Sequence, residues 1–295
     1  MAGGTAGGAA ISGGHGMRLL RVFPRRTNAT PTDELAIIGY PGLIRPEADH
    51  CHVSCAFTWD LPEAERMAEA WSRFLPTTLG GPGTGMRGEE FTPGMYLSEG
   101  HTITSRGCPN SCWFCDVWRR EGPVRELPIR DGWIVNDDNL LACSSEHIAA
   151  VFAMLRRQPH RADLRGGLEA KRMTDRIAMM IAEIRPVQVW FAYDEEEDWQ
   201  PLVDAVRMLR RHDARGGRWL RAYCLIGYPG DTIDAADKRL SECCALGVMP
   251  MAMLYRDARG AKDPIWARFQ RGWVRGPAVG AKMCSLKEAL HAPTP

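Results

Sequence analysis

The 295-residue sequence has little excess of charge of either sign, because 37 Lys and Arg residues face 36 Asp and Glu residues. A formal net charge of +1 excludes strong steering of the whole molecule toward nucleic acid or an anionic membrane, although local patches could still act. Lysine is scarce, with five residues among the 37 basic ones, which we attribute to genome composition. No apolar run approaches the ~20 residues of a membrane helix, so no membrane partner is expected.

The sequence opens without a recognisable signal peptide. Residues 1–16 are rich in Gly and Ala and lack both a charged n-region and a long apolar h-region. Ten cysteines without such a signal indicate a reducing compartment, so we expect a cytoplasmic protein. We predict a flexible tail over 1–16, an N-terminal α/β segment over 17–94, a core over 95–257 and a C-terminal extension over 258–295.

Three cysteines dominate the chemistry that the sequence offers. Cys108, Cys112 and Cys115 are separated by three and then two residues, just after a strand-like run over 101–106. Iron-sulfur cubanes usually have four Cys ligands, so a loop with three would leave one iron open. Zinc remains an alternative, but it needs four ligands, and no second Cys-x2-Cys or His-x3-His follows. A disulfide within the loop would leave one Cys unpaired.

This loop resembles the C-x3-C-x-aromatic-C signature of the radical S-adenosylmethionine (SAM) superfamily, with Phe114 in the aromatic place. The resemblance implies a [4Fe-4S] cluster, SAM bound at the open iron, and cleavage to methionine and a 5′-deoxyadenosyl radical. It also implies a reductant such as flavodoxin or ferredoxin. The segment 226–232 resembles the family's Pro-Gly-Glu-Thr segment, which places Ile226, Gly227 and Pro229 beside the adenine.

Strands and helices alternate after the cysteine loop. Predicted strands over 132–136, 162–165, 187–191, 220–226 and 249–255 are separated by amphipathic segments over 146–157, 174–184, 199–211 and 234–246. With the run before Cys108 they make six strands, the rhythm of a parallel α/β barrel. The resemblance implies a partial (βα)6 TIM-like barrel, in which ligands bind at the carboxyl ends of the strands.

Polar residues and glycines end the predicted strands and are candidate SAM-binding residues. The resemblance implies that one of two segments binds the methionyl ammonium, and the sequence does not decide between them. A helix N-cap is the alternative role for Asp138 or Asn139. Two further strand ends offer contacts to ribose, adenine or substrate. The candidates, in chain order, are Asp137, Asp138 and Asn139; Gly166, Gly167 and Glu169; Tyr193 and Asp194; and Tyr255.

The N-terminal segment predicts a short, truncated Rossmann-like βαβ unit, with strands over 17–24, 50–59 and 76–83 and a helix over 60–74. It resembles the end of the cobalamin-binding domain of one radical SAM subgroup. Because the segment is short and has no Asp-x-His-x-x-Gly, cobalamin is only a secondary candidate cofactor. Cys51 and Cys55 could be metal ligands or members of an apolar strand face.

We therefore expect an enzyme that abstracts hydrogen from a small-molecule, nucleotide or nucleic-acid substrate, and the chain also resembles uncharacterised radical SAM proteins of phage type. The alternatives are a cobalamin-dependent radical SAM methyltransferase and a non-catalytic iron-sulfur or zinc-binding interaction module. Two further features have alternative interpretations. Trp113 either covers the cluster or is a surface aromatic. Cys224 is either a hydrogen-atom donor or, as we favour, a buried structural thiol. Aromatic residues in the extension predict a helix that packs on the barrel.

Overall fold

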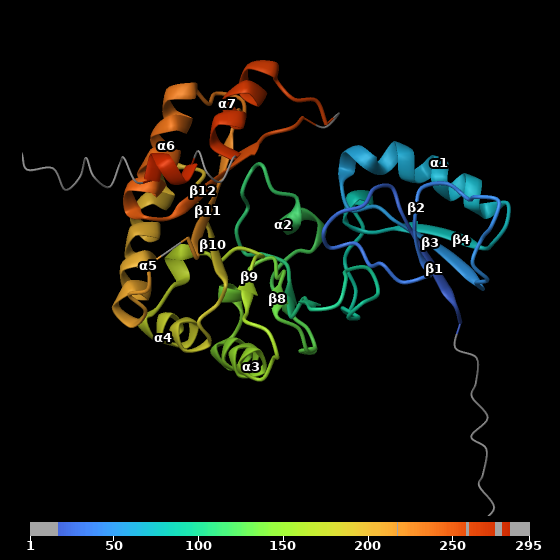
Figure 1. Cartoon of the computed structure of the whole chain (residues 1–295), viewed down its shortest axis with the longest axis horizontal. Helices are drawn as coiled ribbons and strands as arrows, with labels where there is room; N and C mark the ends of the chain where they lie inside the picture. Colours follow the sequence, from blue (N-terminus) through green and yellow to red (C-terminus); the bar gives the residue numbers. More distant parts are fainter. Residues whose placement is uncertain (1–16, 217, 258–259, 275–278, 284–295) are drawn as a thin grey trace, which may run out of the picture.

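The computed structural model describes residues 17–216, 218–257, 260–274 and 279–283 (Figure 1). The chain is mixed α/β with two parallel sheets, as the sequence predicts. The expected tail over 1–16 and most of the residues after 274 lie outside the described residues. Among the described helices, none combines the length and apolar character needed to cross a membrane.

The N-terminal sheet is wider than the predicted βαβ unit. Its strands are β1 (Leu19–Phe23), β2 (Ala36–Ile38), β3 (His50–Ser54) and β4 (Thr77–Gly80), which pair in parallel in the order β2-β1-β3-β4. Helix α1 (Leu61–Ser72) connects β3 to β4 and buries Trp71 against the sheet. Strand β2, three residues long, was not predicted because so short a run has too little periodicity to stand out.

Strand β3 ends five residues before the predicted end at 59, because a 3-10 helix covers Thr58–Asp60. Cys51, Val53 and Cys55 are fully buried in the core beneath α1. The interpretation of Cys51 and Cys55 as members of an apolar strand face is therefore confirmed.

The second sheet has six parallel strands in the order β12-β11-β10-β9-β8-β5, so each strand pairs with the next one along the chain. The strands are β5 (His101–Thr102), β8 (Ile134–Val135), β9 (Asp163–Leu164), β10 (Gln188–Ala192), β11 (Leu220–Ile226) and β12 (Met249–Leu254). They alternate with α3 (Ser145–Arg156), α4 (Asp175–Ile184), α5 (Trp199–His212) and α6 (Ile233–Leu246). Figure 1 shows these helices along one side of the sheet. The predicted strand and helix positions are confirmed within a few residues.

The helices begin where their sequences provide caps. The side chains of Ser144, Thr174 and Thr232 each accept a hydrogen bond from the backbone N–H three residues later, at the start of α3, α4 and α6. Helix α6 ends at Gly247, which takes a left-handed conformation with φ of 75°. The N-caps fix the residue at which each of these helices begins after its strand, and Gly247 fixes the residue at which α6 ends before β12.

The strand predicted over 101–106 is divided in two. After β5 the chain bends and forms β6 (Ser105–Arg106), which pairs antiparallel with β7 (Arg125–Glu126). The Asp137 carboxylate holds this bend, since it accepts hydrogen bonds from Thr104 N and Oγ1, both at 2.6 Å, and from Ser105 Oγ at 2.7 Å. The β6–β7 ribbon closes the base of the cysteine loop, which contains the short helix α2 (Val117–Arg120).

The predicted helix in the extension is confirmed as α7 (Pro264–Val274), which packs against the edge strand β12. Trp273 is 2% exposed and donates from Nε1 to Asp237 Oδ1 of α6 at 3.1 Å. Burial of this large side chain anchors α7 to the helical layer.

Candidate functional site

The cysteine loop is held at its two ends by backbone groups. Gly107 N–H donates to Asp138 Oδ2 at 2.8 Å, and Cys108 N–H donates to Gly122 O at 3.1 Å. Gly107 has a φ of 87°, and a Cβ there would lie 2.3 Å from the carbonyl oxygen of Pro123. Only glycine fits this position. The loop therefore leaves β6 at a defined angle.

Glu121 fixes the far side of the loop to the N-terminal segment. Its carboxylate is 1% exposed, accepts from Gly88 N–H at 3.1 Å, and receives Arg120 Nε at 3.1 Å and Arg125 Nη2 at 3.4 Å. A buried carboxylate with several donors is satisfied, so this contact joins the two parts of the chain firmly.

The three predicted ligands, Cys108, Cys112 and Cys115, carry free thiols, and Cys115 N–H donates to Cys112 O at 3.1 Å. Burial raises the pKa of Cys112, and the charges of Cys115 and Cys108 raise it further. Burial also raises the pKa of Cys115, with Cys108 among the further causes. The thiols are thus close enough to oppose one another's ionisation, which a cationic centre between them would reverse.

These thiols do not converge on one ion. In the described parts of the chain, no group of three or more His, Cys, Asp or Glu side chains is arranged to hold a single metal ion. A mononuclear zinc site needs such convergence, whereas a cubane takes one thiolate on each iron and spreads its ligands. Among the described residues the loop thus shows no preformed site for a single metal ion.

Asn139 joins the two segments between which the sequence could not decide. Its Nδ2 donates to Glu169 Oε2 at 2.6 Å and to Cys108 Sγ at 3.4 Å. Arg172 Nε, at 2.6 Å from Oε2, and Lys171 Nζ, at 3.0 Å from Oε1, also contact Glu169. Burial disfavours the charged form of Glu169, but its hydrogen-bond donors together lower its pKa. Asn139 and Glu169 therefore form one polar group beside Cys108, although they follow different strands.

The other residues of these two segments stabilise the local backbone. Asp137 is buried and fully engaged by Thr104 and Ser105, and Asp138 receives Gly107 N–H. Burial is the main cause that raises the pKa of both carboxyls. A Cβ on Gly166 would lie 2.3 Å from Asp137 O, so this glycine permits close approach of two strand ends. Gly167 has a φ of 92° and turns the chain toward Glu169.

Aromatic rings connect the cysteine loop to the ends of β11 and β12. The Trp113 ring lies 5.3 Å from Phe114, 5.4 Å from Tyr228 and 6.1 Å from Tyr255, centroid to centroid. Its Nε1 donates to Glu195 Oε1 at 3.1 Å. Trp113 is 45% exposed, so it covers this rim while one side faces solvent. The cysteine loop was expected to lie near the Tyr228-Pro229 turn, and the contact of Trp113 with Tyr228 agrees with this, although the pairing of these two rings was not predicted.

The turn after β11 is rigid. Gly227 N–H donates to Asp231 Oδ2 at 2.9 Å, and Arg239 of α6 pairs with the same carboxylate at 3.0 Å. Gly227 has a φ of 73°, and a Cβ there would lie 2.7 Å from the Trp266 ring of α7. Ile226 is fully buried among the helices, and Pro229 is exposed. The turn therefore presents its backbone, not the Ile226 side chain, at the rim.

The two candidate residues after β10, Tyr193 and Asp194, have different surroundings. The Tyr193 hydroxyl donates to Glu242 Oε2 of α6 at 2.6 Å, so it points into the helical layer and not toward the cysteine loop. Asp194 is buried, accepts Leu225 N–H at 2.6 Å, and has its pKa raised to about 6, chiefly by burial. Its charge is among the causes that raise the pKa of Cys112, so Asp194 lies within electrostatic reach of the loop.

Cys224 has the structural role that we favoured. Its side chain is fully buried, and its Sγ lies 3.9 Å from Cys243 Sγ of α6. It therefore faces the helices and not the other side of the sheet, where a hydrogen-atom donor would have to stand.

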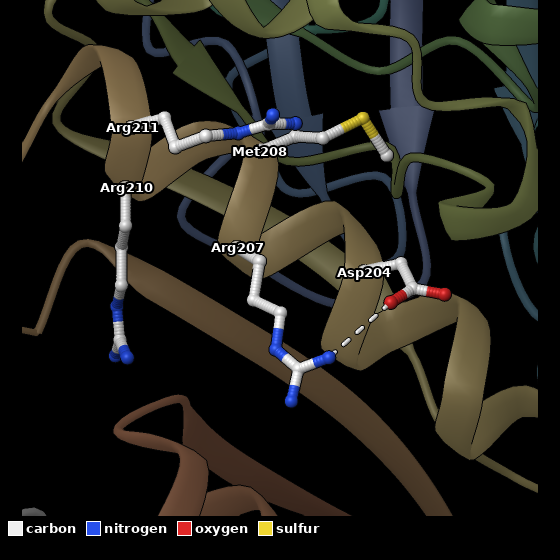
Figure 2. A pocket seen from close by; sticks show the side chains of 5 residues that line it. All are labelled: Asp204, Arg207, Met208, Arg210 and Arg211. Carbon is white, nitrogen blue, oxygen red and sulfur yellow. Dashed lines mark ion pairs between the residues drawn. The ribbon is translucent and has the colours of Figure 1, made fainter.

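A separate hollow lies on the outer surface of α5, lined by Asp204, Arg207, Met208, Arg210 and Arg211 (Figure 2). Its arginines already have partners. Arg207 Nη1 lies 3.7 Å from Asp204 Oδ1, Arg210 Nη2 donates to Leu246 O at 2.6 Å, and Arg211 Nη2 lies 3.3 Å from Asp175 Oδ1. This hollow belongs to the helical layer and is not part of the cysteine site.

Comparison of the chain with protein-family models and with curated proteins yields no match. The function is therefore inferred from the residues and their geometry.

Proposed function

We propose that this chain is a radical SAM enzyme whose six-stranded sheet forms an open, partial (βα)6 barrel. The observation that carries the proposal is the junction of two independent motifs: the Trp113 ring of the cysteine loop lies against Tyr228 of the turn after β11. A loop that only stabilised the fold would not need to reach the carboxyl ends of the parallel strands, where α/β proteins bind their ligands.

The residues present fit a cubane with one open iron. Cys108, Cys112 and Cys115 supply three thiolates, and the Asn139 amide donates to Cys108 Sγ, the kind of hydrogen bond that tunes cluster potential. Once bound, a cluster of this type would supply the reductive cleavage of SAM to methionine and a 5′-deoxyadenosyl radical, with electrons from a flavodoxin or ferredoxin.

The residues present also fit the methionyl end of SAM. Asn139 Oδ1 is buried and has no hydrogen-bond partner among the described residues, which leaves an acceptor beside the cysteine loop. The Glu169 carboxylate, joined to Asn139, is already paired with Lys171 and Arg172. An ammonium group would therefore bind chiefly to the Asn139 oxygen, with Glu169 holding that amide in place.

The rim residues orient and shield the rest of the site. In this proposal the backbone of Gly227 and the ring of Tyr255 contact the adenine, and Trp113, which lies 6.1 Å from Tyr255, would limit water access on the loop side. Water exclusion protects a reactive intermediate from side reactions. The enzyme would then abstract hydrogen from a small-molecule or nucleotide substrate held on the open face of the sheet.

Anaerobic reconstitution with iron and sulfide tests this function. We expect a reduced cluster whose electron paramagnetic resonance spectrum changes when SAM is added, and 5′-deoxyadenosine under reducing conditions. Cys143, a half-buried thiol outside the loop, provides the control. Cys143→Ala should load iron as the wild type does, whereas Cys112→Ala should not. Zinc without iron, or SAM cleavage in Cys112→Ala, would contradict the proposal.

A further inference from the structure

The two faces of the six-stranded sheet differ in chemistry. One face packs its apolar side chains, among them Val189, Phe191 and Ala222, into the core beneath the helices. Most of the alternating residues of the same strands point to the other face and join no apolar core cluster of the described chain; Met249, at the start of β12, is an exception that packs against the core. On β10, β11 and β12 these residues include Gln188, Trp190, Ala192, Arg221, Tyr223, Leu225, Met251 and Met253. We call this second surface the inner face.

The inner face is open to solvent along its β12 edge, whereas Trp190 on β10 is 6% exposed. Met251 and Met253 of the edge strand β12 are each 43% exposed, although they lie on a strand that is paired to the sheet. Figure 1 shows helices α3 to α6 on the opposite side of the sheet and the α2 segment on this side. Methionines adapt to varied apolar shapes, so they suit the wall of a binding surface.

Arg221 lies on this face near the amino end of β11, of which it is the second residue. It lies opposite Trp190 in register, and its guanidinium carbon is 5.1 Å from the centre of the Trp190 ring. Trp190 is itself stacked on Tyr223, with ring centroids 4.3 Å apart and planes 18° from parallel. The aromatic pair therefore fixes the arginine on the sheet, since a guanidinium stacks well on an aromatic face.

The polar groups around Arg221 are incompletely satisfied. Arg221 Nε is buried without a hydrogen-bond partner among the described residues, and so is Asp163 Oδ1. Arg165 binds only the other carboxylate oxygen of Asp163, with Nη2 at 2.5 Å and Nε at 3.2 Å. An unpaired Nε is shared by Arg21, Arg125, Arg215 and Arg239, so it marks Arg221 only together with the place of this residue on the face of the sheet away from the helices.

The charge on this part of the inner face is positive. Burial is the first cause that lowers the pKa of Arg221, and the charges of Arg218 and Arg165 lower it further against the opposing effect of Asp163. Arginine stays protonated in proteins, so the cationic groups outnumber the one carboxylate among them. Burial and the charge of Arg165 also lower the pKa of His101 on β5, at the far edge of the sheet.

We propose that Arg221, supported by Arg165, binds the anionic group of the substrate on the inner face, either a carboxylate or a phosphate. This role as a substrate anchor rests on the proposed function. Arg221 comes six residues before Gly227 at the rim, which at ~3.3 Å per residue places it about 20 Å below the rim. The substrate is therefore an extended molecule whose anionic end lies near the amino ends of the strands, with Met251 and Met253 beside its apolar part.

Isothermal titration calorimetry on the full chain tests this assignment, with inorganic phosphate and malonate as separate probes at constant ionic strength. We expect saturable binding of at least one probe, weakened tenfold or more in Arg221→Gln. Phosphate binding would identify a phosphate-bearing substrate, and malonate binding a carboxylate. Arg207→Gln, on the exposed surface of α5, is the control and should bind within twofold of the wild type.

Arg221→Lys keeps the positive charge but loses the paired N–H donors of the guanidinium, and should weaken binding less than Arg221→Gln does. If circular dichroism shows that Arg221→Gln is unfolded, Arg221→Lys takes its place in the test. The inference is overturned if neither probe saturates, or if the Arg221 variants bind as Arg207→Gln does. Failure here with intact SAM cleavage would leave the proposed function standing. Anion binding without SAM cleavage would remove that function and leave an anion site.

Discussion

Asn139 is the residue through which the candidate site can be tested most directly. The replacement Asn139→Ala removes two hydrogen bonds from one buried amide: the bond to Glu169 Oε2 at 2.6 Å and the bond to Cys108 Sγ at 3.4 Å. The backbone of the cysteine loop should stay in place, because Asp138 and Gly122 hold its ends. The variant therefore changes the surroundings of the cysteine sulfur without removing a ligand.

The two lost bonds predict effects of different kinds. A hydrogen bond to a charged group contributes roughly 1.5–3 kcal/mol, but Glu169 keeps Arg172 and Lys171, so we expect the free energy of unfolding to fall by about 1–2 kcal/mol. A donor near a cluster ligand favours the reduced, more negative state. If the sulfur bond contributes about 0.5–1 kcal/mol to that preference, its loss lowers the reduction potential by about 20–40 mV, at ~59 mV per tenfold change.

A redox titration of the reconstituted protein, followed by electron paramagnetic resonance, measures the potential. Asn136→Ala is the matched control, because Asn136 is a nearby asparagine that donates to His101 and not to a cysteine. The control should keep the wild-type potential. An unchanged or raised potential in Asn139→Ala would refute the reasoning that this amide acts on the Cys108 sulfur.

Three further outcomes are expected. Replacing Cys108, Cys112 or Cys115 singly by alanine should reduce iron loading to background, as measured by iron content, and full loading in any of them would remove that residue as a ligand. Asp194 has a pKa of about 6 in the folded protein against ~3.9 when unfolded, so the native state binds the extra proton and stability falls as pH rises from about 4 to 6. Asp194→Asn should lose this effect and gain about 2–3 kcal/mol relative to the wild type between pH 4 and 7 in urea denaturation, and parallel curves would contradict it. Trp273→Ala should lower the free energy of unfolding by about 3–5 kcal/mol, and a loss below about 1 kcal/mol would mean that α7 is not anchored through this side chain.

The sequence predicted the regular part of the fold well, because long elements carry strong periodicity. Strand β11 was predicted with its observed bounds, and α4, α5 and α6 within one residue at each end. The failures are short elements whose pairing depends on distant residues. Strand β2 has three residues, and the bend between β5 and β6 depends on the buried carboxylate of Asp137. No local pattern encodes a bend that a side chain some thirty positions later holds in place.

The site was predictable as a set of strand ends but not as a set of contacts. The predicted strand ends and the family resemblance pointed to both Asn139 and Glu169, but treated their segments as alternatives for one role, because the two follow different strands. The 2.6 Å contact between them makes them one group. Tyr193 shows the opposite case: a tyrosine at a strand end looked available, but its hydroxyl is used by Glu242 of α6. The direction of a side chain at the end of a strand depends on the twist and register of that strand.

The side chains that alternate between the two faces of β10 and β11 bear directly on function. A strand covered by helices on one face has no structural need for arginine and tryptophan on the other, and a parallel sheet buried on both faces would read as a continuous apolar run. Here Arg221, Tyr223 and Leu225 alternate with fully buried Ala222, Cys224 and Ile226. The guanidinium of Arg221 lies against the Trp190 ring on the face that the helices leave uncovered, which is where an anchor for an anionic ligand would have to lie.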